Sequence, residues 1–215
     1  PSYSTPYHWL SDVYRYSGRV KRSEPYSRRA VELDPISGTG RDGKAFTDLL
    51  LGHLDEARDE YQTILDMGFA PTGPAANLVS FGELLSFDAD QLAEYAARWA
   101  QYSGWPDPPE AEVIGRAVLN PGLRSEALAL LDRMEETGIS SREIAEMTLA
   151  LGDTESAMLR LERAAAAEDA SLFVIGVDPV YDSLREDPRM IRLTKELGLP
   201  NGYDPADDHS DEESS

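Results

Sequence analysis

Two glycine-centred turns, separated by a fixed spacing, restrict the possible folds of this chain more than any other feature. Gly18 precedes a helix-like stretch that ends in Ala30-Val-Glu-Leu-Asp-Pro35, and Gly52 follows Gly18 after 34 residues. Self-similarity at a period of about 20–50 residues is typical of repeat proteins, whose units bury their apolar faces only by stacking on one another. The sequence therefore predicts a stacked array of helical hairpins.

The spacing and its small residues resemble the tetratricopeptide repeat, a pair of antiparallel helices. That family has a small residue at position 8, glycine at 15, alanine at 20 and 27 and proline at 32. Residues 7–35 look like one copy, and four more follow at offsets of 34, 36, 34 and 30 residues. Small residues let helices approach to about 8–10 Å, and glycine makes the left-handed turn between them. The matching residues are Ser11, Gly18, Ser23, Ala30 and Pro35; Ala45, Gly52 and Ala57; Ala93 and Ala100, with Asp88 at the turn; Gly115, Gly122 and Ala127; and Ala145, Gly152, Ala157 and Ala164.

The resemblance implies an all-α fold, a right-handed superhelical solenoid of about five such hairpins with a C-terminal capping helix. The capping segment resembles the end of bacterial repeat proteins whose N-terminal domain is a sensor, kinase, cyclase or winged-helix domain. Its apolar residues are expected to cover the last hairpin, and Asp187 before Pro188 predicts a helix N-cap. These apolar residues are Met190, Ile191, Leu193, Leu197 and Leu199. The predicted copies are 4–37, 38–73, 74–107, 108–137 and 138–170, with the cap at 171–200 and a disordered acidic tail at 201–215, for which an interaction tail is the alternative.

Four residues depart from the repeat pattern. Lys44 and Asp48 stand where large residues are expected, and Phe81 stands at a small position. Pro25 disfavours a helix interior by about 3 kcal/mol, so we expect the second helix to begin at Ser23 or Glu24, or to bend.

The stretch GTGRDGKA, residues 38–45, fits the glycine pattern of a dinucleotide-binding loop and nearly that of a phosphate loop. Such loops follow a buried strand, whereas the preceding segment is charged and helical, and Ala45 stands where Ser or Thr would hold magnesium. We therefore expect no nucleotide cofactor and interpret the glycines as a linker between two repeats.

The composition excludes several chemistries. The chain contains no cysteine, which excludes thiol chemistry, and its three histidines do not have metal-ligand spacing. No apolar run is long enough to span a bilayer. The net charge of −20 disfavours nucleic acid as the partner. Residues 1–44 nevertheless carry a balance of +3, and their basic cluster is either a solvated helix surface or a docking site for an acidic partner or a neighbouring domain. That cluster comprises Arg15, Arg19, Lys21, Arg22, Arg28 and Arg29.

The resemblance implies a noncatalytic interaction scaffold that binds a peptide or protein segment in its concave groove, without cofactor or metal. In this family the first helices line the groove through positions 5, 9, 12 and 13. Charged residues there would orient a ligand and apolar ones would anchor it. The corresponding residues are His8, Asp12, Arg15 and Tyr16; Asp42, Phe46, Leu49 and Leu50; Glu112, Arg116, Leu119 and Asn120; and Arg142, Glu146, Leu149 and Ala150.

Two other function classes remain open. The chain could be a sensory or self-associating part of a larger bacterial regulator of the cyclase, kinase or winged-helix type, and hence a homo-oligomer. An enzyme built on a helical solenoid would need convergent carboxylates, for which Asp12, Glu112 and Glu146 are the candidates. The sequence begins at Pro1 without an initiator methionine, so we expect a processed chain or a piece of a longer one. A cytoplasmic location and the exported part of a membrane-tethered protein both fit.

Overall fold

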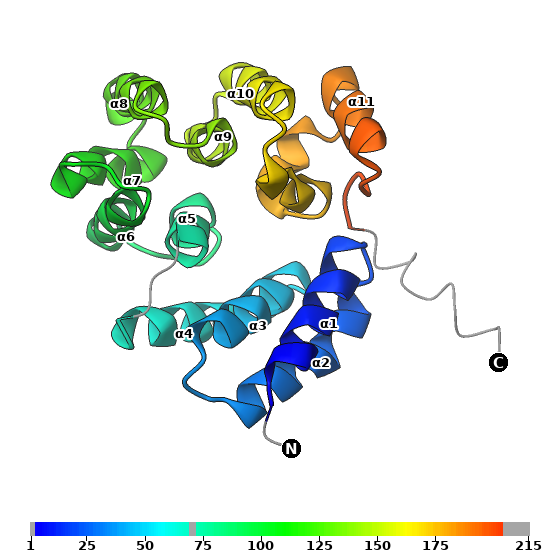
Figure 1. Ribbon diagram of the computed structural model, residues 1–215. Helices are drawn as coiled ribbons and strands as arrows, with labels where there is room; N and C mark the ends of the chain where they lie inside the picture. Colours follow the sequence, from blue (N-terminus) through cyan, green and yellow to red (C-terminus); the bar gives the residue numbers. More distant parts are fainter. Residues whose placement is uncertain (1–2, 69–71, 204–215) are drawn as a thin grey trace. The chain divides into compact units, whose positions relative to one another are not determined.

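The computed structural model describes residues 3–68 and 72–203, which form helices and turns without any strand (Figure 1). The predicted all-α class is therefore confirmed. The acidic stretch 204–215 lies outside the described residues. No helix among the described residues is both long and apolar enough to cross a bilayer.

In the described residues, the α-helices except the last follow one another as antiparallel pairs, and short turns and four 3-10 helices (η) connect the elements. In the first half they are α1 (Thr5–Tyr16), α2 (Val20–Leu33), α3 (Gly38–Leu50), α4 (Leu54–Asp66), α5 (Thr72–Ser80) and α6 (Ala89–Tyr102). In the second half they are η1 (Pro108–Ala111), α7 (Glu112–Leu119), η2 (Pro121–Leu123), α8 (Arg124–Glu136), α9 (Ser141–Ala150), α10 (Thr154–Ala166), η3 (Ala170–Gly176), η4 (Pro179–Leu184) and α11 (Pro188–Leu197).

The chain forms two compact units. The first comprises Pro1–Phe69 together with Phe173–Ser215, and the second comprises Ala70–Leu172. In the first unit, α1 packs on α2, α2 on α3 and α3 on α4, while α1 also contacts α3. In the second unit, α5 packs on α6 and α9, and α9 pairs with α10. Each unit is thus a stack of hairpins, and the right-handed superhelix of the whole chain stays a prediction.

Three of the predicted turn glycines end a first helix in the left-handed conformation. Gly18, Gly52 and Gly152 have φ angles of 80°, 79° and 81°. In the first turn the amide of Arg19 donates to the Tyr14 carbonyl, and His53 and Asp153 donate in the same way in the other two. These hydrogen bonds satisfy carbonyl groups that would otherwise be unpaired at a helix C-terminus. The turn requires a left-handed backbone conformation, which residues with a Cβ rarely adopt. The predicted glycine turns of these three hairpins are therefore confirmed.

The third and fourth turns differ from the prediction. The left-handed residue of the third turn is Ser86, with φ 59°, while Asp88 is the N-cap of α6 and forms a full capping box with Gln91. Gly122 lies inside η2, which leads directly into α8, and its amide donates to the Asn120 side chain. Asp88 and Gly122 therefore lie between paired helices as predicted, but neither has the left-handed backbone expected of a turn residue.

Two further helix boundaries correct the sequence analysis. Helix α2 begins at Val20 and keeps Pro25 in its interior, so the later start at Ser23 or Glu24 was wrong. Its buried residues, Val20, Ser23, Ser27 and Ala30, recur at helical spacing, and their burial stabilises the helix despite the proline. The stretch 38–45 forms the first turns of α3, so its interpretation as a linker was also wrong.

The small residues of the repeat pattern lie where helices cross. Gly115 on α7 is the tightest case, because a Cβ there would overlap the Leu92 carbonyl group of α6 and lie 2.6 Å from the Ala93 nitrogen. This contact explains why position 8 of the fourth copy is a glycine. Most other small residues of the pattern are also fully or almost fully buried: Ser11, Ser23, Ala30, Ala45, Ala57, Ala93, Ala100, Ala127, Ala145, Ala157 and Ala164.

The closing segment begins its helix as predicted. Asp187 caps α11 by accepting a hydrogen bond from the Arg189 amide at 2.8 Å. Met190 and Leu193 are buried, whereas Ile191 and Leu197 are more than two-fifths exposed. The segment belongs to the first unit, in which Pro200 lies against the turn at Gly18, and its role as a cap on the last hairpin stays a prediction.

Candidate functional site

Six predicted groove residues come together on α1 and α3 in the first unit. We call them, with Phe173 of η3, the Arg15 cluster. Helix α3 begins at the N-cap Ser37, whose hydroxyl accepts a hydrogen bond from the Gly40 amide at 3.1 Å. Glycines weaken a helix, so tertiary packing must stabilise this glycine-rich first half of α3. The cluster comprises His8, Asp12, Arg15, Tyr16, Asp42, Phe46 and Phe173.

Gly43 lets α1 and α3 approach each other at the cluster. A Cβ at Gly43 would lie 3.2 Å from Nδ1 of His8 and 3.6 Å from Nη1 of Arg15. The Gly43 carbonyl accepts a hydrogen bond from that same Nη1 at 2.6 Å. The glycine that suggested a phosphate loop therefore has a packing role.

Arg15 is the buried centre of the cluster, with 3% of its surface exposed. Its guanidinium also donates to the Thr47 hydroxyl at 3.1 Å and to a carboxylate oxygen of Asp12. The Cζ atom lies 4.9 Å from the ring centroid of Tyr16 and 5.3 Å from that of Phe46. A buried arginine is tolerated only when it is paired, and cation–π contacts add to its stabilisation. Arg15 thus fixes the surrounding side chains instead of presenting a free charge to a ligand.

The carboxyl group of Asp42 is strongly perturbed by its surroundings. The residue as a whole is partly exposed, yet its Oδ1 atom is enclosed and accepts no hydrogen bond from the described residues. Burial raises the pKa of Asp42 to about 7, although the nearby Arg15 charge acts in the opposite direction and Asp12 adds to the rise. An enclosed carboxyl oxygen without a donor disfavours the ionised form.

Three aromatic rings belong to the cluster. The centroids of Tyr16 and Phe46 lie 6.4 Å apart, and Phe173 meets Tyr16 edge-to-face at 4.7 Å. Phe46 is buried, while Phe173 remains 47% exposed. Burial raises the pKa of Tyr16, which keeps its phenol neutral. Sequence reasoning missed Phe173, since nothing in the repeat pattern links it to the first hairpin.

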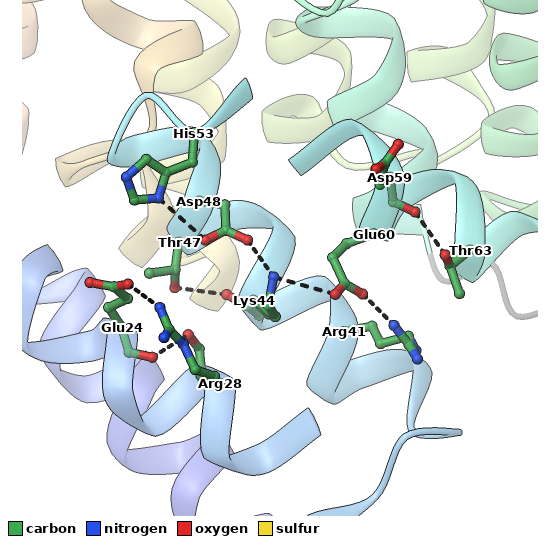
Figure 2. A network of polar contacts seen from close by, with 12 residues as sticks. Glu24, Arg28, Arg41, Lys44, Thr47, Asp48, His53, Asp59, Glu60 and Thr63 are labelled. Atoms are coloured by element: carbon green, nitrogen blue, oxygen red, sulfur yellow. Dashed lines mark hydrogen bonds and ion pairs between the residues drawn. The ribbon is translucent and has the colours of Figure 1, made fainter. Parts of the chain in front are cut away.

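The remaining charged residues of α3 are engaged within the hairpin (Figure 2). The Lys44 ammonium lies 2.7 Å from an Asp48 oxygen and 3.3 Å from Glu60 of α4, and Arg41 also contacts Glu60 at 2.5 Å. Asp48 is buried, so this ion network replaces the apolar contacts that the repeat pattern predicts for Lys44 and Asp48. On the same helix Leu49 is buried and Leu50 partly exposed.

In the second unit, Arg142 and Glu146 form an ion pair on α9 at 2.9 Å. Glu146 is 3% exposed and also lies 3.5 Å from the Ser80 hydroxyl of α5. Burial raises the pKa of Glu146, and Arg142 counteracts that rise. Leu149 is buried and Ala150 partly exposed. This predicted group therefore joins α9 to α5.

Glu112 and Arg116 pair on α7 at 2.8 Å, and Arg116 lies 3.3 Å from Asp90. Both line a pocket of about 480 Å³ between α6 and α7. Leu119 is 41% exposed, and Asn120 caps η2 through its side chain. The three carboxylates considered for catalysis, Asp12, Glu112 and Glu146, are thus each held by an arginine on their own helix.

A further pocket, of about 690 Å³, lies between α1 and α2, away from the Arg15 cluster. Arg28 and Arg29 of the predicted basic cluster line it, each paired with a glutamate: Glu24 at 2.5 Å and Glu32 at 2.7 Å. Arg15, by contrast, is buried, so its place in a surface cluster was wrong. Within the described part of the chain, no three potential metal ligands gather.

The chain is similar to a solved structure described as "YrrB: a TPR protein with an unusual peptide-binding site". The sequences are 16% identical, the match covers 80% of this chain and 91% of that one, and the TM-score is 0.48. No protein-family model matches the chain, and no curated protein matches it.

Proposed function

We propose that the chain is a noncatalytic protein-interaction scaffold that binds a peptide or protein segment on the first helices of its hairpins. One observation carries the proposal: neighbouring first helices bring their predicted contact positions into one patch, the Arg15 cluster. His8, Asp12, Tyr16, Asp42 and Phe173 all remain at least partly exposed in it.

The construction of the patch favours recognition. Hydrogen bonds to Gly43, Thr47 and Asp12 fix the Arg15 side chain, so the groups around it are held in place before a ligand binds. Preorganised side chains lose little conformational entropy on binding, and mixed aromatic and charged residues are typical of interaction hot spots. The carboxylates considered for catalysis are held by arginines, which favours binding over acid–base chemistry.

The experiment is a selection of random peptides by the full chain, followed by affinity measurement against a patch variant. The variant combines His8→Ala, Asp42→Asn and Phe173→Ala, because Arg15 and Phe46 are buried and their replacement would perturb the fold. A control carries Asp55→Asn and Glu56→Gln on the exposed first turn of α4.

Selected peptides should lose at least about tenfold in affinity for the patch variant, equivalent to about 1.4 kcal/mol, and retain it for the control. Failure to select any peptide, or equal binding to all three proteins, would rule out this patch as the recognition site.

Self-association is a second candidate, and exposed apolar residues on α1 favour it. Trp9 and Val13 are each 65% exposed and lie one helical turn apart. Exposed aromatic residues of this kind are typical of protein interfaces. Sedimentation of the wild type and of Trp9→Ser with Val13→Ser tests it: a concentration-dependent mass should disappear in the variant, and a monomer at all concentrations would exclude self-association.

A further inference from the structure

The α1–α2 hairpin is basic although the chain as a whole is strongly acidic. With histidine neutral, residues 5–33 carry six Lys or Arg against three Asp or Glu, a balance of +3, whereas the whole chain has a net charge of −20. Three of the arginines pair with carboxylates inside the hairpin: Arg15 with Asp12, Arg28 with Glu24 and Arg29 with Glu32. The surplus therefore comes from the cations at the start of α2, namely Arg19, Lys21 and Arg22.

The same hairpin contains the pocket of about 690 Å³ described above. Arg28 and Arg29 line it together with their glutamate partners, two tyrosines and a proline. Their side chains are 61% and 49% exposed, so a ligand can reach both from solvent. Glu24 accepts a hydrogen bond from Nη2 of Arg28, and Glu32 accepts one from Nη1 of Arg29. Because a guanidinium group has five N–H donors, a further carboxylate can bind beside each glutamate.

The acidic segment 204–215 follows residues that are anchored in the same unit. Pro200 lies against the turn at Gly18, next to the start of α2, and the Gly202 amide donates to the Gly176 carbonyl at 2.8 Å. A chain of 12 residues spans at most about 40 Å, and the 14 residues of α2 rise about 21 Å. The segment is therefore long enough to reach the pocket from the point at which it begins.

We propose that the acidic segment 204–215 docks on the α1–α2 hairpin, where its carboxylates pair with Arg28 and Arg29 at the pocket. This interaction goes beyond the proposed peptide binding, because the pocket lies away from the Arg15 cluster. The segment contains no lysine or arginine, one histidine and six carboxylates: Asp204, Asp207, Asp208, Asp211, Glu212 and Glu213.

Weak ion pairs are sufficient for such docking. The segment is covalently attached, and a short linker gives an effective concentration of about millimolar at the hairpin. Exposed ion pairs are screened by salt and add little to the free energy of unfolding. The docking should therefore depend on ionic strength and should not change the thermal melt.

The test measures paramagnetic broadening by a nitroxide label attached near the end of the full chain. Because the chain contains no cysteine, Ser214→Cys provides a single site for the label. At low salt the label should broaden the backbone amide signals of α2, most strongly around Arg28 and Arg29. Sodium chloride at about 0.5 M should remove this broadening, since the Debye length is then only about 4 Å.

Full-length variants distinguish docking by charge from mere proximity of the label. Arg28→Gln with Arg29→Gln should reduce the broadening of α2 about fivefold. Replacement of all six carboxylates of the segment by amides should reduce it at least as much. Arg133→Gln with Arg163→Gln is the matched control, because both residues are exposed arginines of the second unit paired with glutamates, and it should leave the broadening unchanged.

Each outcome supports or overturns the docking. Broadening of α2 that requires both the two arginines and the carboxylates of the segment supports it. Absence of broadening, or equal broadening in the charge variants, overturns it. A mixture of labelled chain with unlabelled, isotope-enriched chain identifies the source: broadening of α2 in the enriched chain would come from another molecule and would overturn docking within one chain.

Discussion

Replacing Asp42 by asparagine should stabilise the fold at neutral and higher pH. The carboxyl group has an ordinary pKa of 3.8 in an unfolded chain and a pKa of about 7 in the fold. At about 1.4 kcal/mol per tenfold change in proton affinity, this difference corresponds to at most about 4 kcal/mol. Asparagine has nearly the same volume and no charge to desolvate.

Proton binding determines the direction in which stability changes with pH. Between about pH 4 and pH 7 the folded state holds a proton on Asp42 that the unfolded state has released, so the free energy of unfolding falls as the pH rises. Above about pH 7 Asp42 is ionised in both the folded and the unfolded state, and the loss of stability is complete. Asp42→Asn should therefore match the wild type near pH 4 and exceed its stability by about 2–4 kcal/mol at about pH 8.

The assay is urea unfolding followed by far-ultraviolet circular dichroism across that pH range. Asp12→Asn is the comparison, since Asp12 accepts a hydrogen bond from buried Arg15, and its loss should destabilise the fold by about 1–3 kcal/mol. Two results would contradict a raised pKa of Asp42. The Asp42→Asn protein could be no more stable than the wild type at about pH 8, or its free energy of unfolding could fall with rising pH as steeply as that of the wild type.

Three further predictions concern the rest of the chain. Gly115→Ala should destabilise the second unit by about 1–3 kcal/mol in chemical unfolding, because its Cβ would overlap the Leu92 carbonyl; an unchanged midpoint would contradict the close crossing of α6 and α7. Arg160 is 3% exposed and donates to Asp132, Glu135 and Thr148, so Arg160→Ala should cost about 3–5 kcal/mol, and a loss below about 1 kcal/mol would show that the network is dispensable. Deletion of residues 204–215 should leave the thermal melt unchanged, and a large loss of helix signal would show that these residues support the fold.

The hairpins were predictable because their signals are local. A left-handed turn after a helix selects glycine, so Gly18, Gly52 and Gly152 mark three turns directly. At the third turn Ser86 adopts the left-handed conformation, so the glycine signal is missing there. In α3 the glycines lie inside a helix, so they wrongly predicted a linker.

Part of the candidate site was predictable for the same reason. The positions of His8, Asp12, Arg15 and Tyr16 on one side of α1 follow from helical spacing, and the repeat register places Asp42 and Phe46 on the next first helix. The sequence did not predict which of these residues are buried and which are exposed. Burial depends on the neighbouring helices rather than on the helix that carries the residue.

The sequence by itself determined the all-α class, the helical hairpins and the positions of their small residues, because helix periodicity and turn chemistry act over a few residues. Only the tertiary structure decided that Arg15 is buried beside Gly43, that Asp42 holds its proton to about pH 7 and that Phe173 completes the cluster. These properties arise from desolvation and from contacts between segments far apart in the chain. A local sequence pattern predicts neither of these effects.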